Sequence, residues 1–214
     1  MPGTRALIPQ DRRFLQLHRE RDKQPAQVQR SIIKTYGRTR TSALLEKSYY
    51  DCRHEYDRGL LSGEEYWRRV LERAGAGSDT PDLRRLIDLD VNAWTRINED
   101  VLDLVFRLHA AGVFLALLSN LPADYRVYFA RHFPWLRLFS VCVYSCDLGL
   151  VKPEPGIYRA CLERLRTPPE GCLFVDDMEK NVTAARALGM RGILFVDAGS
   201  LEKELRARLA GVAF

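Results

Sequence analysis

The fold is decided by short apolar runs that end in polar residues, and the clearest is at positions 113–120, which read Val-Phe-Leu-Ala-Leu-Leu-Ser-Asn. Apolar side chains at every position of a run of strand length predict a β-strand that is buried on both faces. A helical pattern from Val101 to Leu108 precedes this run, and Gly112 closes that helix. A helix followed by a doubly buried strand is typical of a parallel sheet.

The same alternation continues on the C-terminal side of this run. Helical patterns and apolar runs follow in the order helix 125–132, strand 139–144, helix 157–165, strand 172–175, helix 182–188 and strand 192–196. A shorter apolar run at residues 5–9 predicts a first strand. Strands that alternate with helices predict an α/β fold with a Rossmann-like parallel sheet.

The stretch between these parts, from about residue 16 to residue 95, is helical in pattern and rich in charge. Apolar residues recur at helical spacing from Leu44 to Tyr56, and Gly59 fits the position after a helix C-terminus. Ser62 and Glu65 form the capping-box pattern, and the helix that follows is expected to bury Tyr66, Trp67, Val70 and Leu71. We predict a core of residues 1–15 and 96–214, with residues 16–95 inserted as an α-helical cap.

Charge, cysteine content and hydropathy limit the partners and the location. Residues 1–40 contain ten Lys or Arg and three Asp or Glu, which leaves a net charge of +5 − 7 = −2 for the rest. Only Phe14 and Tyr36 supply aromatic rings in that basic stretch, so nucleic-acid binding is disfavoured. The five cysteines form no Cys-x-x-Cys pair or zinc set, which favours reduced, mostly buried thiols. With no signal peptide and no membrane-spanning run, we expect a cytoplasmic protein with no membrane contact.

Polar residues follow the strands at the carboxyl ends, where Rossmann-like sheets bind ligands. Ser119 and Asn120 follow one strand, Asp176 and Asp177 follow another, and Lys152 comes a few residues after a third. Each pair alone is an ordinary helix cap or surface turn. Their order and spacing together favour a site for a phosphate and a divalent cation, because a hydroxyl and an ammonium bind phosphoryl oxygens and paired carboxylates hold magnesium.

Three of these segments resemble motifs of the haloacid dehalogenase superfamily of aspartate-nucleophile hydrolases. Residues 117–120 resemble its second motif, residues 147–158 its third and residues 175–189 its fourth, and residues 56–67 resemble the helical cap of its sugar-phosphate phosphatases. The resemblance implies a Rossmann-like core with a small α-helical cap. It also implies Mg²⁺-dependent hydrolysis of a small phosphorylated metabolite, such as a sugar phosphate, through an aspartyl-phosphate.

The resemblance also assigns roles to single residues. It implies that Ser119 and Asn120 bind the transferred phosphoryl group, and that Lys152 binds it and stabilises its charge during catalysis. Asp176 and Asp177 would hold Mg²⁺, directly or through water. A metal-free dehalogenase has no use for paired acids, so the phosphatase chemistry is favoured.

The first motif, which supplies the nucleophile in this superfamily, departs from the family pattern. The family reads roughly Phe-Asp-x-Asp/Gly there, whereas this chain reads Pro9-Gln10-Asp11-Arg12-Arg13. Gapless alignment places Gln10 at the nucleophile and Arg12 at the general acid/base. A glutamine amide is not a useful nucleophile and an arginine repels a metal, so Mg²⁺ binding is weak or absent if Gln10 occupies that position.

Several explanations of this departure stay open. A one-residue slip makes Asp11 the catalytic candidate and leaves Arg13 at the second position. Asp88-Leu89-Asp90 has the Asp-x-Asp spelling but follows no long apolar strand. Residues 9–40 are rich in Gln and Arg, so a frameshift or a mis-called start can have replaced a genuine first motif. The alternative function is a catalytically inactive relative that binds a phosphometabolite or a protein. Neither the substrate nor the oligomeric state is specified by a motif.

Overall fold

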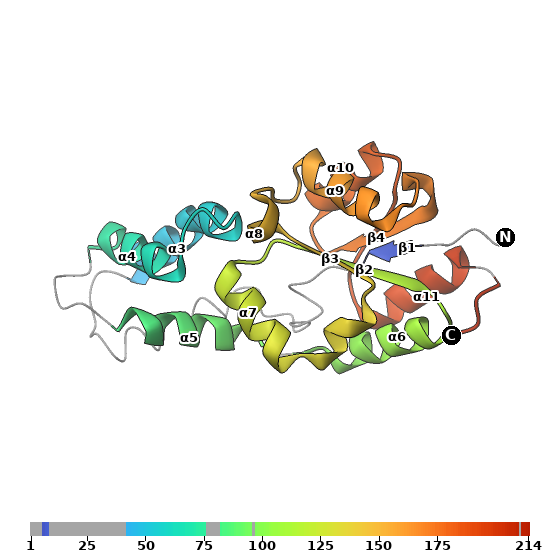
Figure 1. Ribbon diagram of the computed structural model, residues 1–214, viewed down its shortest axis with the longest axis horizontal. Coiled ribbons are helices and arrows are strands. Elements are labelled where there is room, and N and C mark those ends of the chain that lie inside the picture. Colours follow the sequence, from blue (N-terminus) through green and yellow to red (C-terminus); the bar gives the residue numbers. More distant parts are fainter. Residues whose placement is uncertain (1–5, 9–41, 76–81, 96, 210) are drawn as a thin grey trace.

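The computed structural model describes residues 6–8, 42–75, 82–95, 97–209 and 211–214 (Figure 1). Among these residues the sheet has five strands in the order β3-β2-β1-β4-β5, and each neighbouring pair is parallel. The strands are β1 (Ala6–Ile8), β2 (Phe114–Ser119), β3 (Val141–Tyr144), β4 (Cys172–Asp176) and β5 (Arg191–Leu194). The predicted α/β, Rossmann-like sheet is therefore confirmed.

The helices form two groups along the chain. The group that follows β1 in sequence consists of α3 (Ser42–Asp57), α4 (Gly63–Arg73) and α5 (Leu83–Ala93). The group that alternates with the other strands consists of α6 (Glu99–Ala110), α7 (Ala123–His132), α8 (Ser145–Leu148), α9 (Pro155–Leu165), α10 (Glu179–Ala187) and α11 (Ala198–Arg208), with 3-10 turns η1 (Pro134–Leu138) and η2 (Pro169–Gly171). Within the described ranges, no helix is both long and apolar enough to cross a bilayer.

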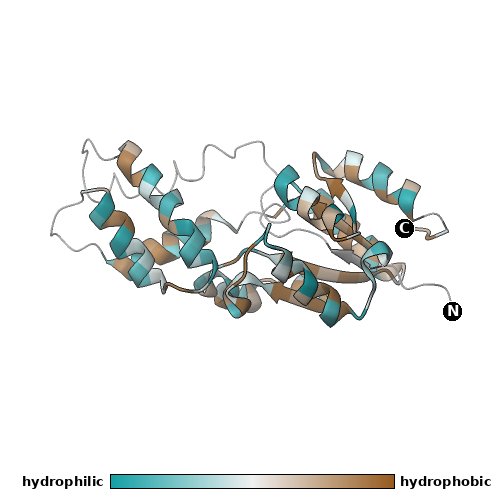
Figure 2. Cartoon of the chain, turned by 90° about the horizontal axis from the view of Figure 1, so that it is seen from above, coloured by the Kyte–Doolittle hydropathy of each residue, from teal (hydrophilic) through white to brown (hydrophobic). Residues whose placement is uncertain are grey.

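Successive strand residues belong to apolar clusters on opposite faces of the sheet. Leu115 and Leu117 of β2 pack in the cluster that contains α6 and α11, whereas Ala116 and Leu118 pack in the cluster that contains α9 and α10. The strands are accordingly mostly brown in Figure 2, between helices that are partly teal. Because helices cover both faces, β2 is apolar at every position before its last residue, Ser119, which explains the run that predicted this strand.

A third apolar cluster joins α3, α4 and α5 with α7. Its aromatic centre contains Tyr56, Tyr66, Trp67 and Tyr125, none of which is more than 1% exposed, and the rings of Tyr56 and Tyr66 stack with centroids 4.3 Å apart. The predicted capping box at the start of α4 is present, and the four apolar side chains expected to be buried in that helix are buried. The helical cap thus packs against α7, the core helix that directly follows β2.

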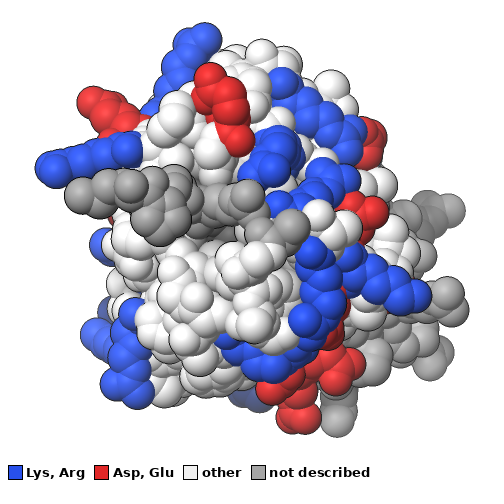
Figure 3. All heavy atoms as spheres, turned by 90° about the vertical axis from the view of Figure 1, so that its right-hand side faces the viewer, with Lys and Arg blue, Asp and Glu red and all other residues white. Residues whose placement is uncertain are grey.

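The surface charge at one end of the molecule is mixed but mainly basic (Figure 3). At the end from which the strands start, Lys and Arg predominate on the surface, with Asp and Glu among them (Figure 3). Helix α11 contains ion pairs within its own length, such as Arg206 with Glu202 and Arg208 with Glu204. The carboxyl ends of the strands lie at the other end, toward α8 and the cap helices (Figure 1).

Candidate functional site

The carboxyl ends of β2 and β4 lie on either side of β1, which pairs with both. β2 ends at Ser119 and β4 ends at Asp176. Lys152 reaches the same edge from the loop after α8. Its Nζ donates to the carbonyl oxygen of Leu118, the residue before Ser119, at 3.0 Å and lies 3.7 Å from Asp176 Oδ2. The parallel sheet therefore brings a hydroxyl, an ammonium and a carboxylate together from three separate segments.

Asp176 is fully buried and accepts hydrogen bonds on both carboxylate oxygens. Oδ1 accepts from the backbone N–H of Met178 at 2.8 Å, and Oδ2 accepts from the side-chain amide of Asn181 at 2.9 Å. Burial raises the pKa of Asp176 to about 7, while the Lys152 ammonium and the Met178 N–H oppose the rise and Asp177 adds to it. The charge of this carboxyl group therefore changes near neutral pH, and a divalent cation would favour its ionised form.

The side chain of Asn120 holds the main chain of Lys152 at two points. Its Oδ1 accepts from the N–H of Lys152 at 2.8 Å, and its Nδ2 donates to the carbonyl oxygen of Lys152 at 3.1 Å. The peptide bond between Lys152 and Pro153 is cis. Asn120 thus links the end of β2 to the loop that carries the buried lysine, and it sets the position from which the ammonium reaches the strand ends.

Two buried polar atoms at this edge lack hydrogen-bond partners in the described part of the chain. They are the Oγ of Ser119 and the Oδ1 of Asn181, on side chains that are 0% and 4% exposed. A buried hydroxyl without a partner costs about 1–3 kcal/mol. A bound anion that accepts from Ser119 would remove that cost, so the edge fits a phosphate group.

The carboxylate oxygens of Asp176 and Asp177 are ligands of the kind that a magnesium ion prefers. No group of three or more His, Cys, Asp or Glu side chains in the described ranges is arranged to hold a metal by itself. Magnesium is usually bound through one or two protein carboxylates, with water and substrate phosphate oxygens as its other ligands. The two aspartates therefore suit a metal that binds together with a phosphate.

The residues of the first motif lie outside the described residues. Gln10, Asp11 and Arg12 follow β1 in the sequence, and β1 is described only from Ala6 to Ile8. The central position of β1 in the sheet agrees with a first motif at the middle of the strand-end edge. The assignment of Asp11 as the nucleophile stays a prediction.

A family model described as haloacid dehalogenase-like hydrolase matches residues 12–189. The chain belongs to this family. A sesquiterpene phosphatase of Aspergillus oryzae is 27% identical over 71% of this chain and 76% of that protein. Bifunctional epoxide hydrolase 2 of Rattus norvegicus is 38% identical over 36% of this chain and 14% of that protein. The chain spans between 10 and 29% of the length of the first curated relatives that it matches.

Solved structures of the haloacid dehalogenase family share the fold. An enzyme from Bacteroides thetaiotaomicron, in complex with magnesium and inorganic phosphate, matches 92% of this chain and 96% of its own with a TM-score of 0.71 and 21% identity. An identity this low shows the common fold alone. The predicted family resemblance and the predicted fold class are both confirmed.

The alternative Asp-x-Asp pair at Asp88 and Asp90 is wrong as a strand-end motif, because both residues lie within α5. Residues two apart on a helix point to different sides. Asp90 is fully buried, accepts a hydrogen bond from Tyr49 at 2.8 Å and lies 3.6 Å from Arg53. This second aspartate therefore belongs to the interior of the cap.

Asp147, in the segment that resembles the family's third motif, does not join the strand-end edge. Its Oδ2 pairs with Arg126 Nε at 3.1 Å, and both side chains are more than a third exposed. The ion pair links α8 to α7 at the surface. Within this segment it is Lys152 that reaches the strand ends.

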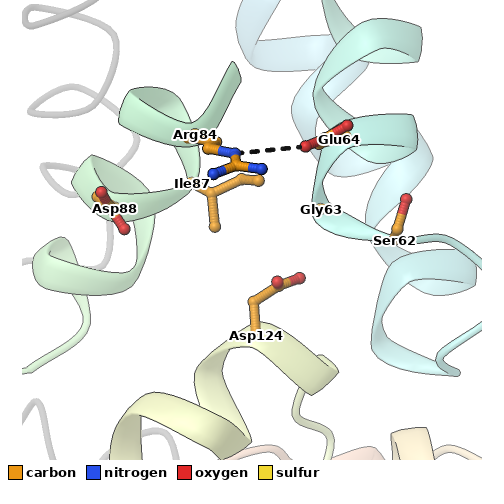
Figure 4. A pocket seen from close by; sticks show the side chains of 7 residues that line it. All are labelled: Ser62, Gly63, Glu64, Arg84, Ile87, Asp88 and Asp124. Carbon is orange, nitrogen blue, oxygen red and sulfur yellow. Dashed lines mark ion pairs between the residues drawn. The ribbon is translucent and has the colours of Figure 1, made fainter. Parts of the chain in front are cut away.

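A hollow of about 460 Å³ lies between the cap and α7 (Figure 4). It is lined by Ser62, Gly63, Glu64, Arg84, Ile87, Asp88 and Asp124. A Cβ on Gly63 would lie 2.7 Å from Asp124 Oδ2 and 2.8 Å from Ile87 Cδ1, so a larger residue there would force these side chains to move. The carboxylate of Asp124 points from α7 toward the gap between α4 and α5, and none of the predicted phosphate or metal residues lines the hollow.

Proposed function

We propose that the chain is a magnesium-dependent phosphatase that hydrolyses a small phosphorylated metabolite, with a sugar phosphate as one candidate. The observation that carries the proposal is the fully buried Ser119 hydroxyl, which lacks a partner among the described residues at the edge reached by the buried Lys152. One phosphoryl group would accept from the hydroxyl and pair with the ammonium. Family membership and the fungal sesquiterpene phosphatase relative support this reaction class.

Each residue of the edge has a role in this proposal. Ser119 donates to a phosphoryl oxygen, and Asn120 contributes by fixing the main chain of Lys152. Lys152 stabilises the negative charge that develops on the phosphoryl oxygens. Asp176 and Asp177 hold Mg²⁺, which supplies Lewis-acid polarisation of the phosphoryl group when bound.

The nucleophile in this proposal is Asp11. Its carboxylate oxygen attacks phosphorus, the bond to the substrate oxygen breaks, and the released alkoxide takes a proton from water. Water then hydrolyses the aspartyl-phosphate and returns the carboxylate. With Asp11 as the nucleophile, the position of the family's general acid/base is occupied by Arg13, so proton transfer to the leaving group depends on water.

A second function, binding without turnover, is favoured by the residues at the first motif. If Gln10 stands at the nucleophile position, the edge retains the hydroxyl and ammonium that bind phosphate but has no atom that forms the new bond. Arg12 would then strengthen binding of an anion and weaken binding of a metal. The protein would act as a phosphometabolite-binding or protein-interaction module.

Turnover of an aryl phosphate with and without Mg²⁺ separates these functions. The phosphatase proposal expects Mg²⁺-dependent turnover that is lost in Asp11→Asn and strongly reduced in Ser119→Ala. Turnover that persists in Asp11→Asn excludes Asp11 as the nucleophile. Binding of inorganic phosphate without turnover selects the inactive relative. Gln10→Asp is the matched gain-of-function variant, because activity that appears only in this variant assigns the nucleophile position to residue 10.

The encoding DNA tests whether residues 9–40 are native. An alternative frame near the start that encodes an Asp-x-Asp strand would support replacement of the first motif, and its absence would reject that explanation. The proposal keeps a core of residues 1–15 and 96–214 with a cap of residues 16–95. It also places the protein in the cytoplasm, and the five unpaired thiols support a reducing compartment.

A further inference from the structure

The turn that follows α3 lies directly on the segment that leads to Lys152. A Cβ on Gly59 would lie 2.6 Å from the carbonyl oxygen of Cys146, and the positive φ of Gly59, +75°, is also one that other residues rarely adopt. The Ser145 hydroxyl donates to the carbonyl oxygen of Asp57, the last residue of α3, and accepts from the N–H of Leu121 at 2.8 Å. The cap turn and the start of this segment are therefore in main-chain contact.

Arg58 extends from this turn to both ends of the loop formed by residues 149–154. Its Nη1 donates to the carbonyl oxygen of Gly149 at 2.6 Å, and its Nη2 pairs with Glu154. The other carboxylate oxygen of Glu154 accepts from the N–H of Val151 at 3.3 Å. The two charged side chains are only 21% and 33% exposed, so water competes only partly for these contacts. Arg58 thus joins the two ends of the loop from the cap side.

The same loop is held from the core side by Asn120, through its two hydrogen bonds to the main chain of Lys152. The loop that carries Lys152 is therefore held by Asn120 from the core and by Arg58 from the cap. Removal of the core contact would free the lysine main chain directly. Removal of the cap contact would free the loop on both sides of it, at Gly149 and at Glu154.

We propose that Arg58 is a positioning residue through which the cap holds Lys152 at the strand ends. Arg58 acts through Gly149 and Glu154 and has no contact with the reacting atoms. A cap that moves away from the core would withdraw the guanidinium and loosen the loop, so the placement of the ammonium depends on the placement of the cap. The effect on the loop follows from the contacts alone, whereas the effect on phosphate binding rests on the proposed function.

Hydrogen exchange of the full chain tests the effect on the loop. Arg58→Ala is expected to accelerate exchange of the amides of Val151 and Lys152 at least tenfold. Arg69→Ala is the matched control, because Arg69 pairs with Glu55 at 2.7 Å and both side chains are about half exposed. Equal exchange in the two variants would overturn the proposal. Glu154→Gln, which keeps the shape of the side chain, is expected to accelerate exchange less, and exchange as slow as in the unaltered chain would contradict the route through Glu154.

Calorimetric binding of inorganic phosphate in the presence of Mg²⁺ tests the effect on the site. Arg58→Ala is expected to weaken binding five- to tenfold, with Arg69→Ala unchanged. Faster amide exchange in the loop together with unchanged phosphate affinity would overturn the link between the loop and the site. If the unaltered chain binds no phosphate, the proposed function fails, while the exchange experiment still decides whether Arg58 orders the loop.

Discussion

The described part of the molecule contains two buried groups of charged side chains, one inside the cap and one at the strand ends, and they differ in how they are satisfied. In the cap, Arg53 donates to Asp57 at 2.9 Å, to Tyr49 at 3.1 Å and to Tyr125 at 3.0 Å. Its guanidinium carbon also lies within 6.0 Å of five aromatic ring centroids. One terminal nitrogen of Arg53 makes no hydrogen bond to a described residue, but aromatic faces surround it.

The group at the strand ends contains a buried donor that no described residue satisfies. Lys152 donates to one carbonyl oxygen and lies near one carboxylate, and the hydroxyl of Ser119 has no partner in the described part of the chain. Aromatic rings surround the guanidinium of the cap group, and in the proposed function a phosphate completes the group at the strand ends. Burial of charge alone therefore does not mark a functional site. A buried donor without a described partner is a useful signal only beside other groups that fit the same ligand, since the ring nitrogens of Trp67 and Trp135 and the Nε of Arg191 also lack described partners.

The largest effect is expected from Arg53→Met in the cap. Removal of this guanidinium breaks the ion pairs that Arg53 makes with the buried Asp57 and Asp90, and loss of one partner of a buried charge pair costs about 3–5 kcal/mol. Urea unfolding followed by circular dichroism measures the loss. Arg69→Ala, which removes an exposed ion pair, serves as control with an expected change of about 0–1 kcal/mol. Equal losses in the two variants would contradict the structural role of the cap group.

Lys152→Met makes the corresponding change at the strand ends, and we expect a smaller loss of stability. The pKa of Asp176 is already raised by burial and is held down by Lys152, so without the ammonium this carboxyl takes up a proton instead of staying charged. The loss should appear in ligand binding, as a decrease of at least tenfold in phosphate affinity, or about 1.4 kcal/mol. A loss of stability as large as that of Arg53→Met would mean that Lys152 is mainly structural.

The pH dependence of Mg²⁺ binding should follow Asp176. Its folded-state pKa of about 7 lies above the ordinary value of 3.8, so the folded protein binds this proton more tightly than the unfolded chain does. Stability contributed by this proton is present below pH 3.8 and is lost as pH rises through 7. Mg²⁺ competes with the proton, so its affinity should rise up to about tenfold per pH unit below pH 7 and level off above it.

Calorimetry of Mg²⁺ binding between pH 5.5 and 8.5 measures this dependence, at about half-unit steps. Asp176→Asn is the control, since it cannot ionise and should bind Mg²⁺ weakly at every pH. Asp177 also faces this carboxyl group and raises its pKa. Asp177→Asn should therefore move the midpoint to lower pH. An affinity that does not change between pH 6 and 8 would exclude Asp176 as a ligand that competes with a proton.

Much of the core could be predicted from the sequence because β2 and β4 are buried on both faces. Their apolar runs are typical of strands in a parallel sheet that is covered on both faces. Parallel pairing then places the residues after each strand at one edge. Helix α8 was not predicted, because four residues carry no periodicity. Helix α11 was also missed, since Leu201 and Leu205 are its only fully buried residues and charged side chains cover the rest.

The sequence predicted which residues gather at the edge better than what their side chains contact. Lys152 reaches the carbonyl oxygen of Leu118 and lies 3.7 Å from Asp176, because the strand ends fix the positions of these segments, and the roles of Ser119, Lys152 and Asp176 stay predictions. The contact between the Asn120 side chain and the Lys152 main chain joins segments 32 residues apart, and that of Arg58 with Glu154 joins segments 96 apart. Such contacts depend on how loops pack, for which periodicity and spacing contain no signal.

The smallest change in stability, and the sharpest contrast, is expected from removing one hydroxyl from each group. Tyr49→Phe removes the hydroxyl that donates to Asp90 and accepts from Arg53. This change should lower the free energy of unfolding by about 1–3 kcal/mol. Ser119→Ala removes a buried hydroxyl without a partner among the described residues, so stability should not fall and should rise by at most about 1–3 kcal/mol, the cost of leaving that hydroxyl unsatisfied. Phosphate affinity should nevertheless fall about tenfold, because a charge-assisted hydrogen bond to the anion is lost.

Paired urea titrations and phosphate calorimetry on these two variants measure both quantities. The expected result is opposite in the two groups: Tyr49→Phe lowers stability at unchanged phosphate affinity, and Ser119→Ala lowers phosphate affinity without any loss of stability. If Ser119→Ala is as destabilising as Tyr49→Phe, the hydroxyl already has a protein partner outside the described ranges. The edge would then be complete without a ligand, and the difference between the two groups would disappear.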